Sequence, residues 1–158
     1  MQKKGLDLTF SNALDKINDL IGVRAVCAYV DDTYKVADLL QKQQDIRVIK
    51  IKDYIRQPKE SGYKSYHMLV TVPIFLSDCI IDTKVEIQIR TMAMDFWASL
   101  EHKIYYKFEG NAPDYISRDL RECSGIVSML DAKMLQLNEA ILEAKAAQEE
   151  QEGDTGAV

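Results

Sequence analysis

The stretch "KVEIQIRTMAMDFW", residues 84–97, decides the fold class because a strand pattern passes directly into a helix pattern within it. Apolar residues at positions 85, 87 and 89 alternate with Glu86, Gln88 and Arg90. A period of two predicts a strand with one apolar face and one polar face. An acid, an amide and a guanidinium in succession are unusual for a solvent face, which favours Thr, Ser or Lys. The polar face is therefore either simply hydrated or part of a site.

Strand and helix patterns alternate along the rest of the chain. Asp31 and Asp32 are expected to N-cap one of the helices. The run at 20–30 is apolar and Val-rich, which is typical of a strand buried on both faces. The pattern predicts helices at 9–19, 33–43 and 91–107, strands at 20–30, 45–55, 66–75 and 79–90 with the last two antiparallel, and a loop at 56–65. These elements indicate one α+β or α/β domain.

Residues 115–148 are expected to form one long helix. Its apolar residues recur at alternating spacings of three and four, at Leu120, Cys123, Val127, Leu130, Met134, Leu137, Ile141 and Ala144. Such a heptad seam suits a partner helix, but a helix packed on its own sheet is an alternative, and one helix can do both. We predict a single domain at 1–148, with an oligomerisation helix at 114–148 and a disordered acidic tail at 149–158.

The composition excludes several classes of protein. A chain of 158 residues is long enough for one sizeable core. No apolar run approaches the ~20 residues of a membrane span, and a net charge of −5 argues against wholesale binding of duplex nucleic acid, although not of single-stranded RNA. Three widely spaced cysteines indicate no disulfide framework and no Cys-rich zinc site. We therefore expect a cytoplasmic protein.

Two charged residues stand out around the first apolar run. Asp19 directly precedes this run, where a carboxylate at a strand's entry can hold a metal, or can simply be a solvated helix-end acid. Arg24 is the only charge within the run. A buried Arg needs an anionic partner, which is either a carboxylate of the protein or a phosphate.

A second candidate is the basic segment that leads into and through the loop. It contains five cations with tyrosines between them, at Lys50, Lys52, Tyr54, Arg56, Lys59, Tyr63, Lys64 and Tyr66. This combination suits a phosphate-bearing ligand with a base that can stack. Gly62 lets the backbone turn and present the Tyr63 ring. The alternative is a solvated loop with aromatic fillers.

The third candidate is the polar face of the opening stretch. Glu86 can coordinate Mg²⁺ or accept a proton, Gln88 can bind a ribose or base, and Arg90 can pair with phosphate. His67 lies on the neighbouring predicted strand and can reach the same face. Together with Asp19 and the basic loop, these residues outline a magnesium-nucleotide site. The chemistry implied is phosphoryl-type transfer, in which positioning and charge neutralisation supply most of the acceleration.

Three separated blocks resemble one family, the RelA/SpoT-type (p)ppGpp synthetases, and in particular their small single-domain members, the small alarmone synthetases. The blocks are "DLIGVRAV" (19–26), "KDYIRQPKESGYKSYH" (52–67) and "VEIQIRTMAMDFWASLEHKIYYK" (85–107). The resemblance implies a mixed sheet flanked by helices, like that of nucleotidyltransferases. It also implies a GTP diphosphokinase that moves the β,γ-pyrophosphate of ATP onto the 3′-hydroxyl of GTP or GDP, with AMP as the second product, in the stringent response.

The resemblance also assigns roles to positions of this chain. Asp19 and Glu86 match the two catalytic acids, which hold Mg²⁺, and Glu86 is the one thought to activate the 3′-hydroxyl. Tyr63 matches a tyrosine that stacks on guanine. Contacts to GTP or GDP are implied for Lys52, Lys59, His67 and Gln88, and phosphate-binding or structural roles for Arg24 and Arg90. Small members assemble as tetramers through C-terminal helices, which fits the heptad seam.

Three positions or segments depart from the family pattern. Ser61 stands where long members often have Asn, and Asp95 where small members often carry Asn beside the guanine site. The family's ATP-binding strand and helix should precede Lys3, and the given sequence begins after it. The alternatives to a synthetase are therefore a guanine-nucleotide-binding regulatory module that lacks the ATP site, and a structural oligomer whose polar strand face is merely hydrated.

Overall fold

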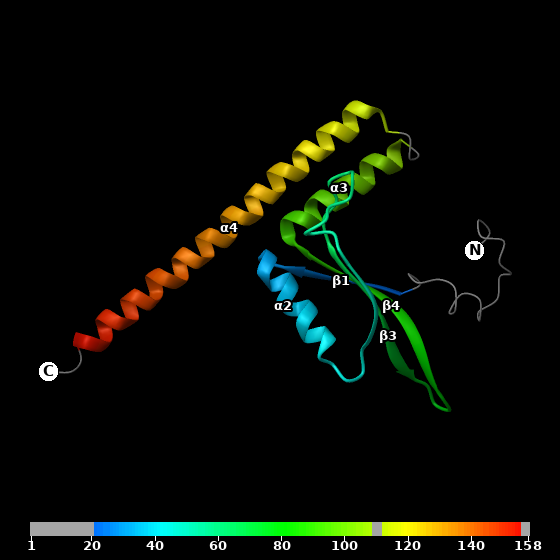
Figure 1. Ribbon diagram of the computed structural model, residues 1–158, viewed down its shortest axis with the longest axis horizontal. Helices are drawn as coiled ribbons and strands as arrows, with labels where there is room; N and C mark the ends of the chain where they lie inside the picture. The colour runs from blue at the N-terminus through cyan, green and yellow to red at the C-terminus, as the bar shows by residue number, and fades with distance from the viewer. Residues whose placement is uncertain (1–20, 109–111, 156–158) are drawn as a thin grey trace.

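The computed structural model of the chain describes residues 21–108 and 112–155, with side chains described as far as Glu149. The helix expected at 9–19 lies outside these residues. The elements are β1 (Ile21–Cys27), α2 (Val30–Gln41), β2 (Arg47–Asp53), β3 (Tyr66–Phe75), β4 (Ile80–Thr91), α3 (Met92–Lys107) and α4 (Asp114–Thr155). Figure 1 shows the helices beside a twisted sheet, with α4 as a long rod that extends well past it.

The sheet has the strand order β1-β4-β3-β2. β1 runs parallel to β4, whereas the β3–β4 and β2–β3 pairs are antiparallel, so the sheet is mixed. The expected α+β fold with a mixed, helix-flanked sheet and a long C-terminal helix is confirmed. One prediction was wrong. β1 lies at the edge of the sheet, and Val23 and Val26 are each 48% exposed, because an edge strand has a neighbour on one side only.

The main core lies between α2 and one face of the sheet. It contains the apolar residues of β4 together with residues of β3 and α2, namely Val85, Ile87, Ile89, Tyr66, Met68, Val70 and Ala37. α2 begins at Val30 with Tyr29 as its N-cap, so the predicted N-cap role of Asp31 and Asp32 was wrong. Both acids lie in the first turn instead, where a negative charge interacts favourably with the helix dipole.

A second core joins α3, α4 and the loop that precedes β3. Thr91 ends β4 and N-caps α3, since its hydroxyl accepts a hydrogen bond from the Met94 backbone N–H at 3.1 Å. Trp97 and Ala98 of α3 pack with Tyr63 of the loop and Leu120 of α4. The Trp97 indole also donates to the Leu120 carbonyl at 3.0 Å, which fixes α3 against α4.

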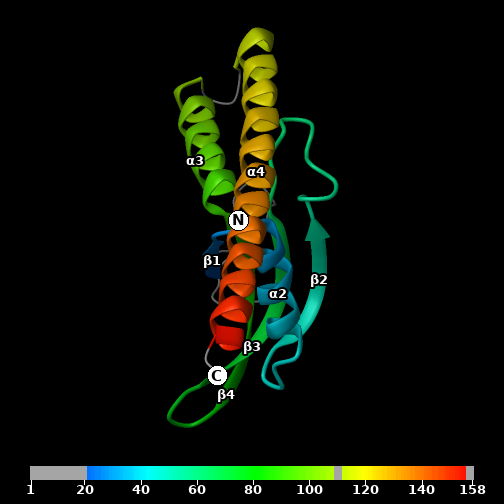
Figure 2. The same cartoon turned by 90° about the vertical axis from the view of Figure 1, so that its left-hand side faces the viewer.

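α4 is packed along its first part and exposed along the rest. Leu120 is buried and Val127 packs beside it, whereas Leu130, Met134, Leu137 and Ile141 are each about half exposed. Figures 1 and 2 show this helix lying against α3 and then extending beyond it. The packed part therefore contacts mainly α3. The alternative of a helix packed on its own sheet is changed accordingly, because the partner within the chain is a helix.

The far end of α4 also differs from the prediction. The helix was expected to end near Gln148, with a disordered tail from 149, but it continues to Thr155. The stretch after Gln148 contains good helix formers, Glu and Gln, so loss of apolar periodicity did not end the helix. Within the described residues, no helix has the length and apolar character needed to cross a membrane.

Candidate functional site

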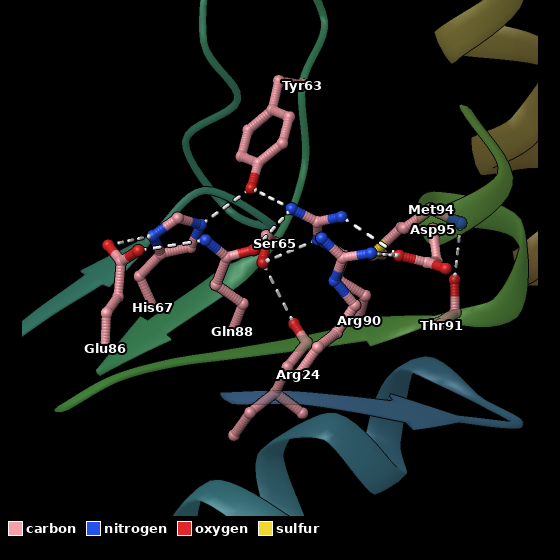
Figure 3. Close-up of polar contacts among 11 residues, drawn as sticks. Arg24, Tyr63, Ser65, His67, Glu86, Gln88, Arg90, Thr91, Met94 and Asp95 are labelled. Carbon is pink, nitrogen blue, oxygen red and sulfur yellow. Dashed lines mark hydrogen bonds and ion pairs between the residues drawn. The ribbon is translucent and has the colours of Figure 1, made fainter. Parts of the chain in front are cut away.

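The candidate site lies on the face of the sheet opposite α2. The alternation of β4 that directs its apolar residues to the core directs Glu86, Gln88 and Arg90 to this face. Pairing with β3 places His67 directly opposite Gln88, and pairing of β3 with β2 places Lys52 opposite His67. Figure 3 shows Glu86, His67, Gln88, Tyr63 and Arg90 gathered in one row of polar contacts. The sequence predicted that Glu86, Gln88 and Arg90 share one face and that His67 reaches it, and the structure confirms this placement.

A chain of hydrogen bonds runs from Arg90 to Glu86. The Arg90 guanidinium donates to the Tyr63 hydroxyl, whose oxygen lies 2.8 Å from His67 Nε2. Because an ionised carboxylate only accepts hydrogen bonds, His67 carries its proton on Nδ1 and donates it to Glu86 Oε1 at 3.1 Å, and the Tyr63 hydroxyl donates to Nε2 of the neutral ring. Gln88 donates to the other carboxylate oxygen of Glu86 at 3.0 Å. The network therefore orients the Glu86 carboxylate from two sides.

The same contacts set the charge states of the two titratable groups. Burial lowers the pKa of His67 below its ordinary value of 6.5, although the neighbouring Glu86 carboxylate opposes the shift. Burial alone would raise the pKa of Glu86. Hydrogen bonds from Gln88 and His67, together with the Lys52 charge, outweigh burial and lower the pKa of Glu86. A neutral imidazole thus stands beside an ionised carboxylate at neutral pH.

Arg90 is a buried cation with many partners. Its residue is 4% exposed, and its guanidinium donates to Gln88 Oε1 at 2.8 Å, to Asp95 Oδ1 at 3.1 Å and to Ser65 Oγ at 3.3 Å, in addition to Tyr63. Such a fork of donors on a planar group is specific to arginine. Arg90 therefore supports the row of side chains that the sequence placed on this face.

Arg24 shares one of these partners. Its guanidinium lies 3.2 Å from Asp95 Oδ1, the same oxygen that Arg90 contacts. The side chain of Arg24 is half exposed, so the expectation of a buried arginine was wrong, because β1 is an edge strand. Of the two anionic partners considered for Arg24, the structure supplies the carboxylate. Contact with a phosphate stays a prediction.

The basic loop reaches the site through its aromatic rings. Tyr63 is 8% exposed, so it is not a filler in a solvated loop. Lys59 Nζ lies 4.5 Å from the Tyr63 ring centre and 4.9 Å from that of Tyr54, and Lys52 Nζ lies 5.9 Å from Tyr54. Stacking of Tyr63 on a base stays a prediction, and Arg90 and Lys59 already lie near its ring.

Tyr66, which the sequence grouped with the loop tyrosines, belongs to the main core instead. Its ring packs edge-on against Tyr34 of α2 at 5.6 Å, because residue 66 faces the opposite side of β3 from His67.

A cavity of about 460 Å³ opens beside this network. Arg24, Tyr63, Gln88 and Arg90 form one wall. The other wall belongs to α3, with Ala98, Ser99, Glu101, His102 and Lys103. Glu101 and His102 are adjacent in the sequence and therefore lack metal-ligand spacing, so no motif marks them as site residues. The direct passage of β4 into α3 was the signal that α3 residues would border the same site.

The described residues include only one of the two predicted metal ligands. Asp19 lies outside the described residues, and in residues 21–108 and 112–155 no three His, Cys, Asp or Glu side chains are grouped to hold a metal ion. Glu86 is 31% exposed, so its carboxylate can reach a ligand in solvent. Mg²⁺ is commonly bound by one or two carboxylates, substrate phosphates and water. A single accessible carboxylate fits that mode and excludes an all-protein cage by the described residues.

Comparison with known proteins identifies the family. The family described as "Region found in RelA / SpoT proteins" matches residues 1–111. The chain belongs to the RelA/SpoT family. It is 42% identical over 141 residues to GTP pyrophosphokinase YwaC of Bacillus subtilis (strain 168), which covers 89% of this chain and 67% of YwaC. It is 40% identical over 134 residues to GTP pyrophosphokinase YjbM of the same strain, covering 85% of this chain and 64% of YjbM.

A solved structure gives the same assignment. Small alarmone synthetase 1 from Bacillus subtilis, bound to its product pppGpp, matches this RelA/SpoT chain with a TM-score of 0.80 at 36% identity. The match covers 89% of this chain and 71% of that one. The chain spans about two thirds of the length of the two curated relatives. The resemblance that the three sequence blocks indicated is confirmed.

Proposed function

We propose that this RelA/SpoT chain acts as a GTP pyrophosphokinase that makes (p)ppGpp. The observation that carries the proposal is the accessible Glu86 carboxylate, which His67 and Gln88 orient and hold ionised on the open face of the sheet. An oriented carboxylate within hydrogen-bond reach of an acceptor hydroxyl is the general base that such a transfer needs. Relatives named as GTP pyrophosphokinases support this reading over a regulatory module without activity.

In the proposed reaction Glu86 accepts the proton of the 3′-hydroxyl of GDP or GTP. The 3′-oxygen attacks the β-phosphorus of ATP, a new oxygen–phosphorus bond forms, and the bond from the β-phosphorus to the bridging oxygen of AMP breaks. AMP leaves with that oxygen. Lys52 and Lys59 supply positive charge for the acceptor's phosphates, and Gln88 and Tyr63 bind its nucleoside. Most of the acceleration then comes from positioning and charge stabilisation.

Mg²⁺ is the proposed cofactor, with Glu86 and Asp19 as its protein ligands. When bound, the ion neutralises charge on the transferred phosphates. Glu86 fits this role because its carboxylate is accessible, and each oxygen accepts one described hydrogen bond and keeps further lone pairs. Phosphate-binding or structural roles are proposed for Arg24 and Arg90, which both contact Asp95.

The test uses the purified chain with labelled ATP, Mg²⁺ and GDP or GTP. We expect labelled (p)ppGpp and AMP in equal amounts, and no product after chelation of Mg²⁺. Glu86→Gln keeps the shape of the side chain but removes the base, so the rate should fall about 100-fold or more. An equally active Glu86→Gln would refute its role. Binding of GDP without any product from the unaltered chain would instead support the binding module.

We also propose that the exposed part of α4 forms an oligomer interface, with a homotetramer as the expected state. Its half-exposed residues continue the predicted seam beyond the part that packs on α3. Leu130→Asp combined with Leu137→Asp should yield monomers in light scattering, whereas an unchanged mass would remove the seam from the interface. A cytoplasmic location, a stringent-response role and binding of single-stranded RNA stay predictions.

A further inference from the structure

The loop that carries Tyr63 is fastened to α4 by two serines one helical turn apart. Ser124 Oγ donates a hydrogen bond to the Gly62 carbonyl, and Ser128 Oγ accepts one from Lys64 Nζ at 2.6 Å. Gly62 and Lys64 flank Tyr63 directly in the sequence. Ser128 also donates to the Ser124 carbonyl at 2.8 Å, which leaves its oxygen free to accept from Lys64. We call Ser124 and Ser128 the serine clasp.

The packing at Gly62 shows how closely α4 approaches this loop. Gly62 has a φ of +91°, a region that residues with a side chain rarely adopt. A Cβ atom placed on Gly62 would lie 2.7 Å from Ser124 Cβ and 3.0 Å from Ser124 Oγ. Glycine thus allows both the turn and the contact. Ser124 is 6% exposed, so this contact excludes water.

The serine clasp holds the residues on both sides of Tyr63, whereas the other contacts of this turn are local or belong to the Tyr63 side chain. Within the loop, Gly62 N–H donates to the Lys59 carbonyl at 2.8 Å and Lys59 N–H to the Tyr63 carbonyl at 3.1 Å, which shapes the turn locally. These bonds do not attach the turn to the rest of the protein. The attachment comes from the Tyr63 side chain, whose ring packs against Trp97 and Leu120 and whose hydroxyl bonds with Arg90 and His67, and from the two serines.

We propose that Ser124 and Ser128 are positioning residues that hold Tyr63 and Lys59 at the acceptor-nucleotide site. The proposal rests on the proposed function, because it deepens the role of the same site. Neither serine contacts the row from Glu86 to Arg90, so each acts through the loop. α4 also bears the exposed apolar seam. The same helix would therefore contact a second copy of the chain and hold the loop that carries Tyr63.

The experiment compares Ser124→Ala, Ser128→Ala and the double variant with the unaltered chain. Loss of one of these partly buried hydrogen bonds should raise KM for GDP and the GDP dissociation constant about threefold to tenfold per site. KM for ATP should stay unchanged, since the loop faces the acceptor. Amide hydrogen exchange over residues 59–65 should become faster. Calorimetry with GDP alone gives the dissociation constant without turnover.

Controls separate a positioning role from general destabilisation. Ser77→Ala makes the same chemical change in the exposed β3–β4 turn and should alter none of these quantities. Ser128→Thr keeps the hydroxyl and should retain the GDP affinity. Thermal unfolding of each variant should show that the fold persists. A double variant with unchanged GDP affinity and unchanged loop exchange, or one with equal increases in both KM values, would overturn the proposal.

Failure of the proposed function gives a different result. If the unaltered chain makes no product but binds GDP, and the double variant binds it more weakly, the serine clasp stands and the synthetase activity fails. If the unaltered chain makes product while the double variant matches it in every acceptor measurement, the activity stands and the clasp fails. If neither turnover nor GDP binding occurs, both fail.

Discussion

The two faces of β4 differ although they are built from alternate residues of one strand. On one face Val85, Ile87 and Ile89 pack beneath α2 and are at most 9% exposed. On the other face Glu86 and Gln88 are partly exposed, and only Arg90 is buried. The first face is stabilised by apolar area removed from water. The second is held by directional hydrogen bonds among charged and polar groups.

The two faces of β4 differ in how exactly their side chains must be oriented. Apolar contacts are non-directional, so the core face fixes the strand in place and tolerates conservative changes of similar volume. The polar face must hold a carboxylate, an imidazole and a guanidinium in defined orientations, and each loses its partners if a neighbour is removed. Changes on the first face should therefore appear in stability, and changes on the second mainly in ligand binding and activity.

The largest expected effect on stability comes from the core face. Ile89→Ala removes a fully buried side chain from the middle of the sheet and leaves a cavity. We expect the free energy of unfolding to fall by about 2–5 kcal/mol in urea denaturation. The control is Ile49→Ala on β2, where the residue is 48% exposed, with a loss below about 1 kcal/mol. Equal losses at the two sites would contradict the assignment of the core.

An intermediate effect is expected from the buried cation of the polar face. Arg90→Lys keeps the charge, but a single ammonium cannot serve Asp95, Tyr63 and the other partners together. Groups left unpaired should lower the free energy of unfolding by about 1–3 kcal/mol and weaken GDP binding.

Arg24→Lys is the matched control for this prediction. It changes a half-exposed arginine that contacts the same oxygen of Asp95, so the loss of stability should stay within about 1 kcal/mol. A larger loss for Arg24→Lys than for Arg90→Lys would show that the exposed pair, not the buried fork, supports Asp95.

Much of this contrast was predictable because strand periodicity is a local property. The alternation in residues 85–90 placed Glu86, Gln88 and Arg90 on one face, and the neighbouring strand added His67, as the structure confirms. The position of β1 was not predictable in the same way. A Val-rich strand at the sheet edge and one at its centre have the same local pattern, and only the pairing of all four strands distinguishes them.

The parts of the site that sequence reasoning missed depend on contacts between distant segments. Ser65, directly before β3, contacts Arg90 of the neighbouring strand β4, and Ser124 reaches Gly62 from a helix 62 positions further along the chain. Serine has no periodic signal that distinguishes such a partner from a solvated surface residue. The α3 wall of the cavity likewise depends on how α3 leaves β4. The composition and residue spacing of the sequence do not encode how such distant segments are oriented relative to one another.

The smallest expected effect is a pH dependence that belongs to the polar face alone. Burial lowers the pKa of His67 in the folded chain below its ordinary value of 6.5, which it keeps in the unfolded chain. At a pH between the folded and the unfolded pKa, the unfolded chain therefore binds a proton that the folded chain does not. The stability that the neutral imidazole contributes is complete above pH 6.5, and it is lost as the pH falls through this window. The free energy of unfolding should therefore fall on mild acidification.

His67→Gln should remove this part of the slope, which chemical denaturation at closely spaced pH values between 7.5 and 5 would measure. His102→Gln removes the chain's other histidine, which is exposed on α3, and serves as the control. If the stability of His67→Gln fell with pH as steeply as that of the unaltered chain, the slope would come from other groups. The buried, neutral state of His67 would then have to be given up, and with it the proton assignment that joins Tyr63 to Glu86.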